Sequence, residues 1–173
     1  LLRHDIDICP KIALNFASFE NSLNVKSLYM FLYNSNFYKL EDYISEVASI
    51  IELGHKIGIH FDCSKSNKDN IYNNIEDVKS IFKNKFKIKV DSISFHRPKD
   101  ELIGGDEVIN NLTNCYSAKL VKYYISDSRY SWRVGDPIKY IKKNRPYIQI
   151  LTHPIWWSEH TKDPVANFSN FFN

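Results

Sequence analysis

The sequence lacks any long apolar run: no stretch approaches the roughly 18 residues that a membrane-spanning helix needs, and no signal peptide is visible. Its net charge is only +3, which indicates no strong attraction to nucleic acid or to a membrane surface. Cysteine is scarce, because Cys9, Cys63 and Cys115 form an odd set without CxxC spacing. That pattern is typical of a reducing compartment, so we expect a cytoplasmic protein without a transmembrane segment or nucleic-acid partner.

Internal repeats, low-complexity tracts and linkers rich in Pro or Gly are also missing, so one domain over residues 1–173 is expected. The composition is that of an ordinary globular protein, with 43% hydrophobic and 25% charged residues, and the chain is long enough to bury a sizeable core. The chain begins at Leu1, inside a strand pattern and without a methionine. We therefore expect that an N-terminal segment is missing.

The apolar periodicity predicts strands that alternate with helices. Seven strands are expected, at 1–8, 25–33, 55–62, 90–96, 115–120, 123–127 and 147–153. Helical patterns lie at 12–23, 40–51 and 71–82, a short helix is expected at 137–143, and the tail at 163–173 is expected to be helix or loop. This order is typical of an α/β fold with parallel strands and right-handed crossovers. Seven strands are one short of a full eight-stranded (β/α) barrel.

Side chains that bind metals or move protons lie at the ends of these strands, where α/β enzymes place their sites. They are Asp5, Asp7, His60, His96, Asp127 and His153. Strand side chains alternate between two faces, and the apolar face is expected beneath the helices. The opposite, inward face then carries Asp5, Asp7, His60, Asp62 and His96. His4 lies on the outer face of its strand, so it is expected in the apolar core between the sheet and the helices. The sequence therefore predicts that five chemically active side chains converge.

Two carboxylates on one strand, Asp5 and Asp7, would lie about 6.6 Å apart and repel each other in a partly dry cleft. A divalent cation removes this conflict, so we predict Asp7 and His60 as metal ligands, with Asp5 held ionised and free to accept a proton. A satisfied polar network without a metal is the alternative. Cys9 and Cys63 follow the strands that carry Asp7 and His60, but small buried side chains are the favoured interpretation of both.

Five short segments, in this order, resemble the motifs of the polysaccharide deacetylase family, also called carbohydrate esterase family 4. They are HDID at 4–7, GHKIGIHFD at 54–62, HRP at 96–98, DSRYSW at 127–132 and LTHP at 151–154. The chain is most similar to a divergent branch of the family found in glycan-biosynthesis clusters. The resemblance implies a distorted seven-stranded (β/α) barrel, polysaccharide-deacetylase-like.

The resemblance also implies roles for individual residues. Asp5 is expected to be the catalytic base, oriented by Arg97 in the Arg-Pro motif. His153 is expected to be the general acid, and Asp127 to pair with it and keep it protonated. These roles suit hydrolysis of an amide, which needs one group to accept a proton and another to donate one.

The metal-binding set departs from the family at one position, because Ser64 stands where a second metal histidine is expected. A catalytic zinc usually has three protein ligands and a water. We predict His96 as the third ligand of a divalent metal, foremost Zn²⁺, with Asp62 as the alternative. His55 is expected to be structural and His160 to be solvated.

The predicted activity is removal of an N-acetyl group from a sugar, a polysaccharide precursor or a nucleotide sugar. Trp132, Trp156 and Trp157 offer flat faces that stack on sugar rings, with core packing as an equally supported alternative. Two other functions stay open: a metal-free glycan-binding barrel, suggested by Ser64, and a metal-dependent amidase or esterase for a non-sugar substrate. The presence of both Asp5 and His153 favours an enzyme over a binding module.

Overall fold

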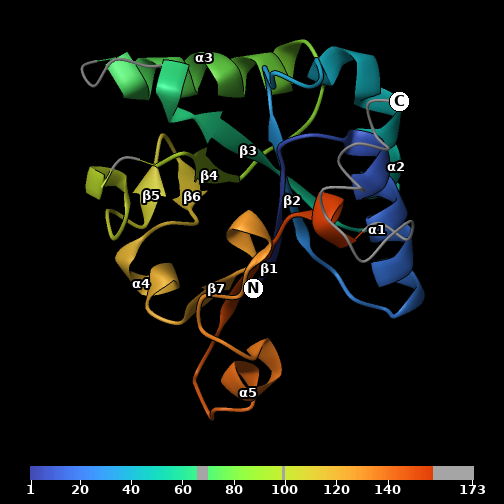
Figure 1. Ribbon diagram of the computed structural model, residues 1–173. Coiled ribbons are helices and arrows are strands. Elements are labelled where there is room, and N and C mark those ends of the chain that lie inside the picture. The colour runs from blue at the N-terminus through green and yellow to red at the C-terminus, as the bar shows by residue number, and fades with distance from the viewer. Residues whose placement is uncertain (66–69, 99, 158–173) are drawn as a thin grey trace.

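The computed structural model of the chain describes residues 1–65, 70–98 and 100–157. Eight strands form one sheet: β1 (Leu2–Ile6), β2 (Leu28–Leu32), β3 (Lys56–Asp62), β4 (Ser92–His96), β5 (Val108–Ile109), β6 (Leu112–Asn114), β7 (Tyr124–Ser126) and β8 (Gln149–Thr152). Their order in the sheet is β5-β6-β4-β3-β2-β1-β8-β7. Every neighbouring pair is parallel except β5 and β6. The sheet curls into a half-barrel (Figure 1).

Three longer helices cover the outer face of the sheet: α1 (Pro10–Ser22), α2 (Ile44–Glu52) and α3 (Ile71–Asn84). The main apolar core lies between this face and the helices, where Ile57, Ile59 and Phe61 of β3 are at most 5% exposed. Two short helices, α4 (Ala118–Val121) and α5 (Pro137–Ile141), belong to the other half of the chain. Short 3₁₀ turns connect the elements: η1 (Leu40–Tyr43), η2 (Cys63–Lys65), η4 (Asp100–Leu102), η5 (Ser128–Tyr130) and η6 (Pro154–Trp157).

A glycine in β3 keeps the inner face of the sheet open to a neighbouring side chain. Gly58 lies beside Met30 of β2, which in turn lies beside Asp5 of β1. A Cβ atom at Gly58 would lie 2.4 Å from the sulfur of Met30 and 3.0 Å from the backbone oxygen of Ser92. The missing side chain at Gly58 therefore leaves room for the side chain of Met30.

A buried polar cluster on the outer face joins α1 to the sheet. The carboxylate of Glu20 lies 2.9 Å from Nε2 of His4 and accepts a hydrogen bond of 2.7 Å from the hydroxyl of Tyr29. Burial alone would raise the pKa of Glu20, but its hydrogen bonds to His4 and Tyr29 outweigh burial and lower that pKa. His55 lies in the same cluster, 3.8 Å from Glu20. His4 and His55 are thus core histidines, as the sequence predicted.

The α/β class and the alternation of strands and helices agree with the prediction, and the main difference lies in the second half of the sheet. The strand predicted at 115–120 is wrong: the strand ends at Asn114, and α4 begins at Ala118. A hairpin of β5 and β6 raises the strand count to eight, and within the described residues the edge strands β5 and β7 do not pair. Asn110 and Asn111 have φ values of 50° and 60°, as a two-residue hairpin turn requires.

No helix among the described residues is long and apolar enough to cross a membrane. The segment predicted at 163–173 and the residue His160 lie outside the part of the chain that the structure describes.

Candidate active site

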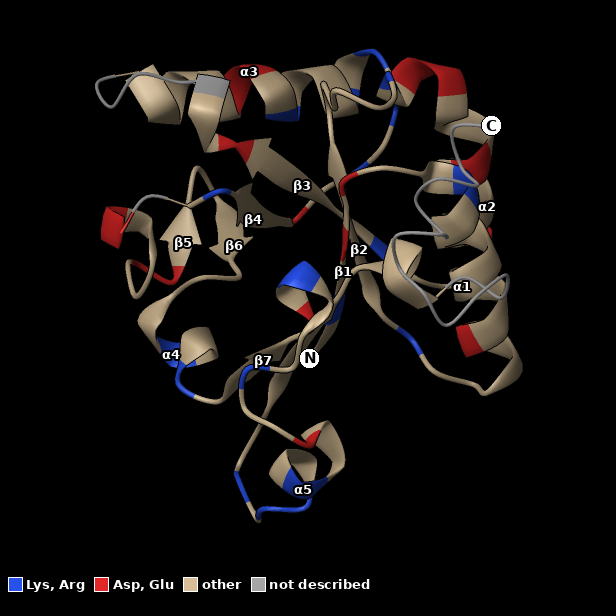
Figure 2. Ribbon diagram, in the orientation of Figure 1, with Lys and Arg blue, Asp and Glu red and all other residues tan. Residues whose placement is uncertain are grey.

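Three side chains from neighbouring strands meet on the inner face of the sheet. Asp7 directly follows β1, His60 belongs to β3 and His96 ends β4. One oxygen of Asp7, Oδ1, lies 3.1 Å from Nε2 of His60 and 3.3 Å from Nδ1 of His96. The three candidate ligand atoms lie within 4.8 Å of one another. The alternation of side chains along the strands predicted that these residues lie close together. Figure 2 shows acidic residues on β1 near the middle of the fold.

This cluster fits a divalent cation. Oδ1 of Asp7 is buried and has no hydrogen-bond partner among the residues that the structure describes, so a strong acceptor is left for a cation. Burial would raise the pKa of Asp7, but His60 and His96 outweigh burial and lower it well below its ordinary value. The neighbouring carboxylate of Asp7 raises the pKa of His96. One carboxylate and two imidazoles are a donor set that zinc accepts.

The other candidate ligands lie outside the cluster. Asp62 accepts hydrogen bonds through Oδ1 from the backbone N–H of Ser64, at 2.9 Å, and from its hydroxyl, at 2.7 Å. Ser64 thus closes the turn after β3, where the family resemblance placed a histidine. Cys9 and Cys63 are buried thiols, and neither belongs to the metal-binding group found among the described residues.

A histidine and a carboxylate at the ends of β8 and β7 form a pair beside this cluster. Nδ1 of His153 lies 2.6 Å from Oδ1 of Asp127, and Nε2 of His153 lies 3.8 Å from Oδ2 of Asp7. The backbone N–H of His153 also donates to Asp127, at 2.9 Å. Burial would lower the pKa of His153, but Asp127 and Asp7 outweigh burial and raise it. The pair therefore presents a readily protonated imidazole nitrogen toward the cluster.

The partner of Asp5 differs from the one that the resemblance implied. The guanidinium of Arg3 donates from Nη2 to Oδ2 of Asp5 at 3.3 Å, and both residues are at most 2% exposed. Arg97 is exposed with a φ of 53°, and no hydrogen bond or ion pair joins it to Asp5 within the described residues. Burial would lower the pKa of Arg3, but Asp5 outweighs burial and raises it. The sequence held a signal for Arg3, because parity places it on the same inward face as Asp5.

Trp157 is exposed and lies next to Trp132, whereas Trp156 packs elsewhere. The ring of Trp132 lies 6.2 Å from that of Trp157, which is 46% exposed and donates from Nε1 to Oδ2 of Asp127 at 2.8 Å. Trp156 instead packs against a small apolar cluster and against the ring of Tyr130, 6.0 Å away. The exposed ring of Trp157 is therefore joined directly to the pair of His153 and Asp127, and Trp156 follows the core-packing alternative.

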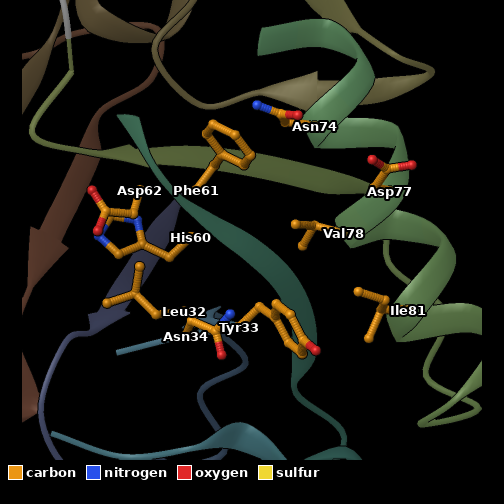
Figure 3. Close-up of a pocket in the computed structure, with 10 residues that line it drawn as sticks. All are labelled: Leu32, Tyr33, Asn34, His60, Phe61, Asp62, Asn74, Asp77, Val78 and Ile81. Atoms are coloured by element: carbon orange, nitrogen blue, oxygen red, sulfur yellow. The ribbon is translucent and has the colours of Figure 1, made fainter. Parts of the chain in front are cut away.

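A cavity of about 330 Å³ lies between β3, α3 and the segment after β2 (Figure 3). Phe61, Val78 and Ile81 give it apolar walls, and Asn74 and Asp77 add polar groups. Figure 3 shows that the side chains of His60 and Asp62 point to the opposite side of β3 from α3. His60 and Asp62 nevertheless line part of the cavity, so it adjoins the candidate metal-binding cluster at β3.

No protein-family model and no curated sequence matches the chain significantly. Solved structures do match. BA3943 from Bacillus anthracis, described as a CE4 family pseudoenzyme, superimposes with a TM-score of 0.61 at 11% identity, over 99% of this chain and 59% of that protein. The peptidoglycan deacetylase PdaC from Bacillus subtilis superimposes with a TM-score of 0.60 at 11% identity, over 89% of this chain and 73% of that protein.

The chain thus spans about three fifths of the length of BA3943. At such identities the similarity concerns the fold, and it agrees with the fold that the five sequence motifs implied. The chain has the fold of the CE4 polysaccharide deacetylases.

Proposed function

We propose that the protein is a metal-dependent hydrolase that removes an N-acetyl group from a sugar unit of a glycan or glycan precursor. One observation supports this most: Nε2 of His153 lies 3.8 Å from Oδ2 of Asp7, beside the group that fits a cation. A proton donor and a cation site are thus neighbours. Hydrolysis of an unactivated amide needs both, because the amine leaves only after it is protonated.

The metal would be held by Asp7, His60 and His96, with zinc as the expected ion. When bound, such an ion lowers the pKa of its water ligand toward ~7 and polarises the carbonyl oxygen of the acyl group. The three protein ligands leave a coordination position for that water and for the substrate.

His153 would supply the proton for the leaving amine from Nε2. Asp127 accepts from Nδ1 and from the backbone N–H of His153, so it fixes the ring and stabilises the imidazolium. Because Asp127 helps to raise the pKa of His153, the pair favours the protonated form of the ring. The geometry therefore suits a general acid.

The exposed Trp157 and its partly buried neighbour Trp132 are our candidate sugar platform. Aromatic faces stack on the apolar faces of sugar rings, and Trp157 is hydrogen-bonded to the carboxylate that holds His153. A sugar stacked there would lie beside the proposed acid. The fold similarity to PdaC, a peptidoglycan deacetylase, is consistent with a glycan substrate.

A metal-free glycan-binding protein is the second candidate. It is favoured by Ser64, in place of the expected histidine, and by the fold similarity to the pseudoenzyme BA3943. The hydrolase is better supported, because His96 completes a three-ligand cluster without residue 64.

Acetate release by the zinc-loaded protein tests the proposal, with N-acetylglucosamine oligomers, peptidoglycan fragments and nucleotide sugars as substrates. We expect His153→Ala to lower turnover by roughly 10²- to 10⁴-fold while zinc stays bound. Asp7→Asn should lose both zinc and turnover. Zinc binding without acetate release from any N-acetylated sugar would reject deacetylation, and a wild-type protein that binds glycan but no zinc would support the second candidate.

A further inference from the structure

The second nitrogen of His60 faces a buried polar chain beneath the metal-binding cluster. Nδ1 of His60 lies 2.7 Å from the hydroxyl oxygen of Ser94, and that hydroxyl donates to Oδ1 of Asp5 at 3.3 Å. Arg3 is the next member, with Nε 3.2 Å from Oδ1 of Asp5. Ser94 and Arg3 are fully buried, and Asp5 and His60 are at most 3% exposed.

The contact between Ser94 and Asp5 favours one direction for these hydrogen bonds. An ionised carboxylate only accepts, so the single proton of the Ser94 hydroxyl goes to Asp5. Ser94 must then accept from Nδ1 of His60, which places the ring proton on that nitrogen. The lone pair of Nε2 is left for the cation at Asp7.

Asp5 is part of this buried polar chain and does not face the open side of the site. Its Oδ2 lies 3.7 Å from Nδ1 of His60, whereas it is Nε2 of that ring that faces Asp7. Both carboxylate oxygens of Asp5 have charged or hydroxyl partners in Arg3 and Ser94. Only 2% of Asp5 is exposed, which leaves little room for a substrate or an attacking water.

We propose that Arg3, Asp5 and Ser94 are positioning residues that hold the tautomer and ring orientation of His60, and that Asp5 acts through His60 and not on the substrate. The inference rests on the metal site of the proposed function. It replaces the role of catalytic base that the motif resemblance implied for Asp5.

Arg3 makes this arrangement possible because a buried carboxylate needs a partner. Its guanidinium carbon lies 4.8 Å from the centre of the Tyr116 ring, so the charge is held between Asp5 and an aromatic face. The pair is anchored on one strand, at positions i and i+2 of β1. Arg3 thus keeps Asp5 in place beneath His60 without help from a loop.

The zinc affinity of Ser94→Ala, measured by competition with a chelating dye, tests the proposal without any turnover. Loss of such a supporting hydrogen bond weakens metal binding by about 10- to 100-fold, and we expect that range. Ser92→Ala is the matched control, since Ser92 lies two residues away on the same face, is buried, and donates its hydroxyl to Asp91. The control should bind zinc as the wild type does. Equal affinities for Ser94→Ala and the control would overturn the proposal.

Asp5→Asn gives the second arm of the test. We expect at least a tenfold loss of zinc affinity, because the amide cannot hold both Arg3 and Ser94. Complete loss of turnover at unchanged zinc affinity would instead make Asp5 a catalytic base and reject our inference. If this variant does not fold, Ser94→Ala decides, since it leaves the pair of Asp5 and Arg3 intact.

The two proposals fail in different ways. A wild-type protein that binds zinc but releases no acetate would refute the deacetylase function, while the comparison of Ser94→Ala with Ser92→Ala would still decide the role of the buried chain. A wild-type protein that binds no zinc would refute both.

Discussion

Replacing Asp127 by Asn tests the proposed acid pair most directly. The two oxygens of Asp127 accept from Nδ1 of His153, from the backbone N–H of His153 and from Nε1 of Trp157. An amide has one oxygen, so in Asp127→Asn its NH₂ group must face one of these donors. The substitution keeps the shape of the side chain but removes its charge and at least one hydrogen bond.

The expected loss follows from the hydrogen bond at 2.6 Å between Asp127 and His153. A hydrogen bond to a charged group contributes about 1.5–3 kcal/mol, which corresponds to roughly a 10- to 150-fold lower kcat. The sign of the pH effect is also fixed. Asp127 raises the pKa of His153, so its removal lowers that pKa and moves the alkaline loss of activity to lower pH.

Steady-state acetate release as a function of pH measures both effects, and zinc affinity serves as the control because Asp127 contacts none of the proposed ligands directly. We expect kcat to fall while zinc affinity stays within a factor of two of the wild type. A kcat within threefold of the wild type, or a parallel loss of zinc, would refute the role of Asp127 as the partner of a general acid.

Three further substitutions probe the fold and the platform. In Gly58→Ala the new methyl group would lie 2.4 Å from the sulfur of Met30, so we expect a loss of about 1–3 kcal/mol in the free energy of unfolding, measured by denaturant titration. Glu20 has a lowered pKa beside His4, so its stabilisation is complete above its ordinary pKa of 4.5 and is lost as the pH falls through the lower folded-state pKa. The stability difference between wild type and Glu20→Gln should therefore shrink on acidification below 4.5, and a constant difference would contradict this. Trp132→Ala should raise KM for an oligosaccharide several-fold with little change in kcat, and an unchanged KM would exclude the platform.

The side chains of the inner face were predictable because strand alternation is a local property. A period of two places Asp5, His60 and His96 on one face whatever the rest of the chain does, and neighbouring parallel strands then bring them together. The same rule placed His4 in the core. Strands with a clear alternation of side chains thus allowed the sequence to predict which residues lie at the centre of the candidate site.

Arg3 is a partner of Asp5 that motif similarity did not indicate. Its parity was correct, but the task of holding Asp5 was given to Arg97 because of the Arg-Pro motif. The partner of Asp5 lies only two residues away on the same strand, where the side chains are adjacent by geometry. A buried carboxylate needs a positively charged partner. Arg3 provides it for Asp5 from the same strand, so no loop has to be positioned.

The hairpin of β5 and β6 could not be found from periodicity. Strands of two and three residues are too short to show alternation, and their position depends on pairing with β4, which is distant in sequence. The pair Asn110 and Asn111 was the only local signal, because asparagine tolerates the positive φ values that such a turn needs.

The register of β3 and β4 explains how the site forms without a histidine at position 64. His60 lies opposite Ser94, and Asp62 lies opposite His96. One face of β4 therefore carries both Ser94, which contacts His60, and, two residues later, His96, the proposed third ligand. The family pattern takes its second histidine from the segment after His60, whereas the site proposed for this chain would take it from the next strand. A shift of β4 by one residue would turn both Ser94 and His96 toward the helices. In the proposed site, metal binding would therefore be coupled to strand register. A variant that loosens β4 should then lose zinc before it loses the pair of His153 and Asp127, which depends on β7 and β8.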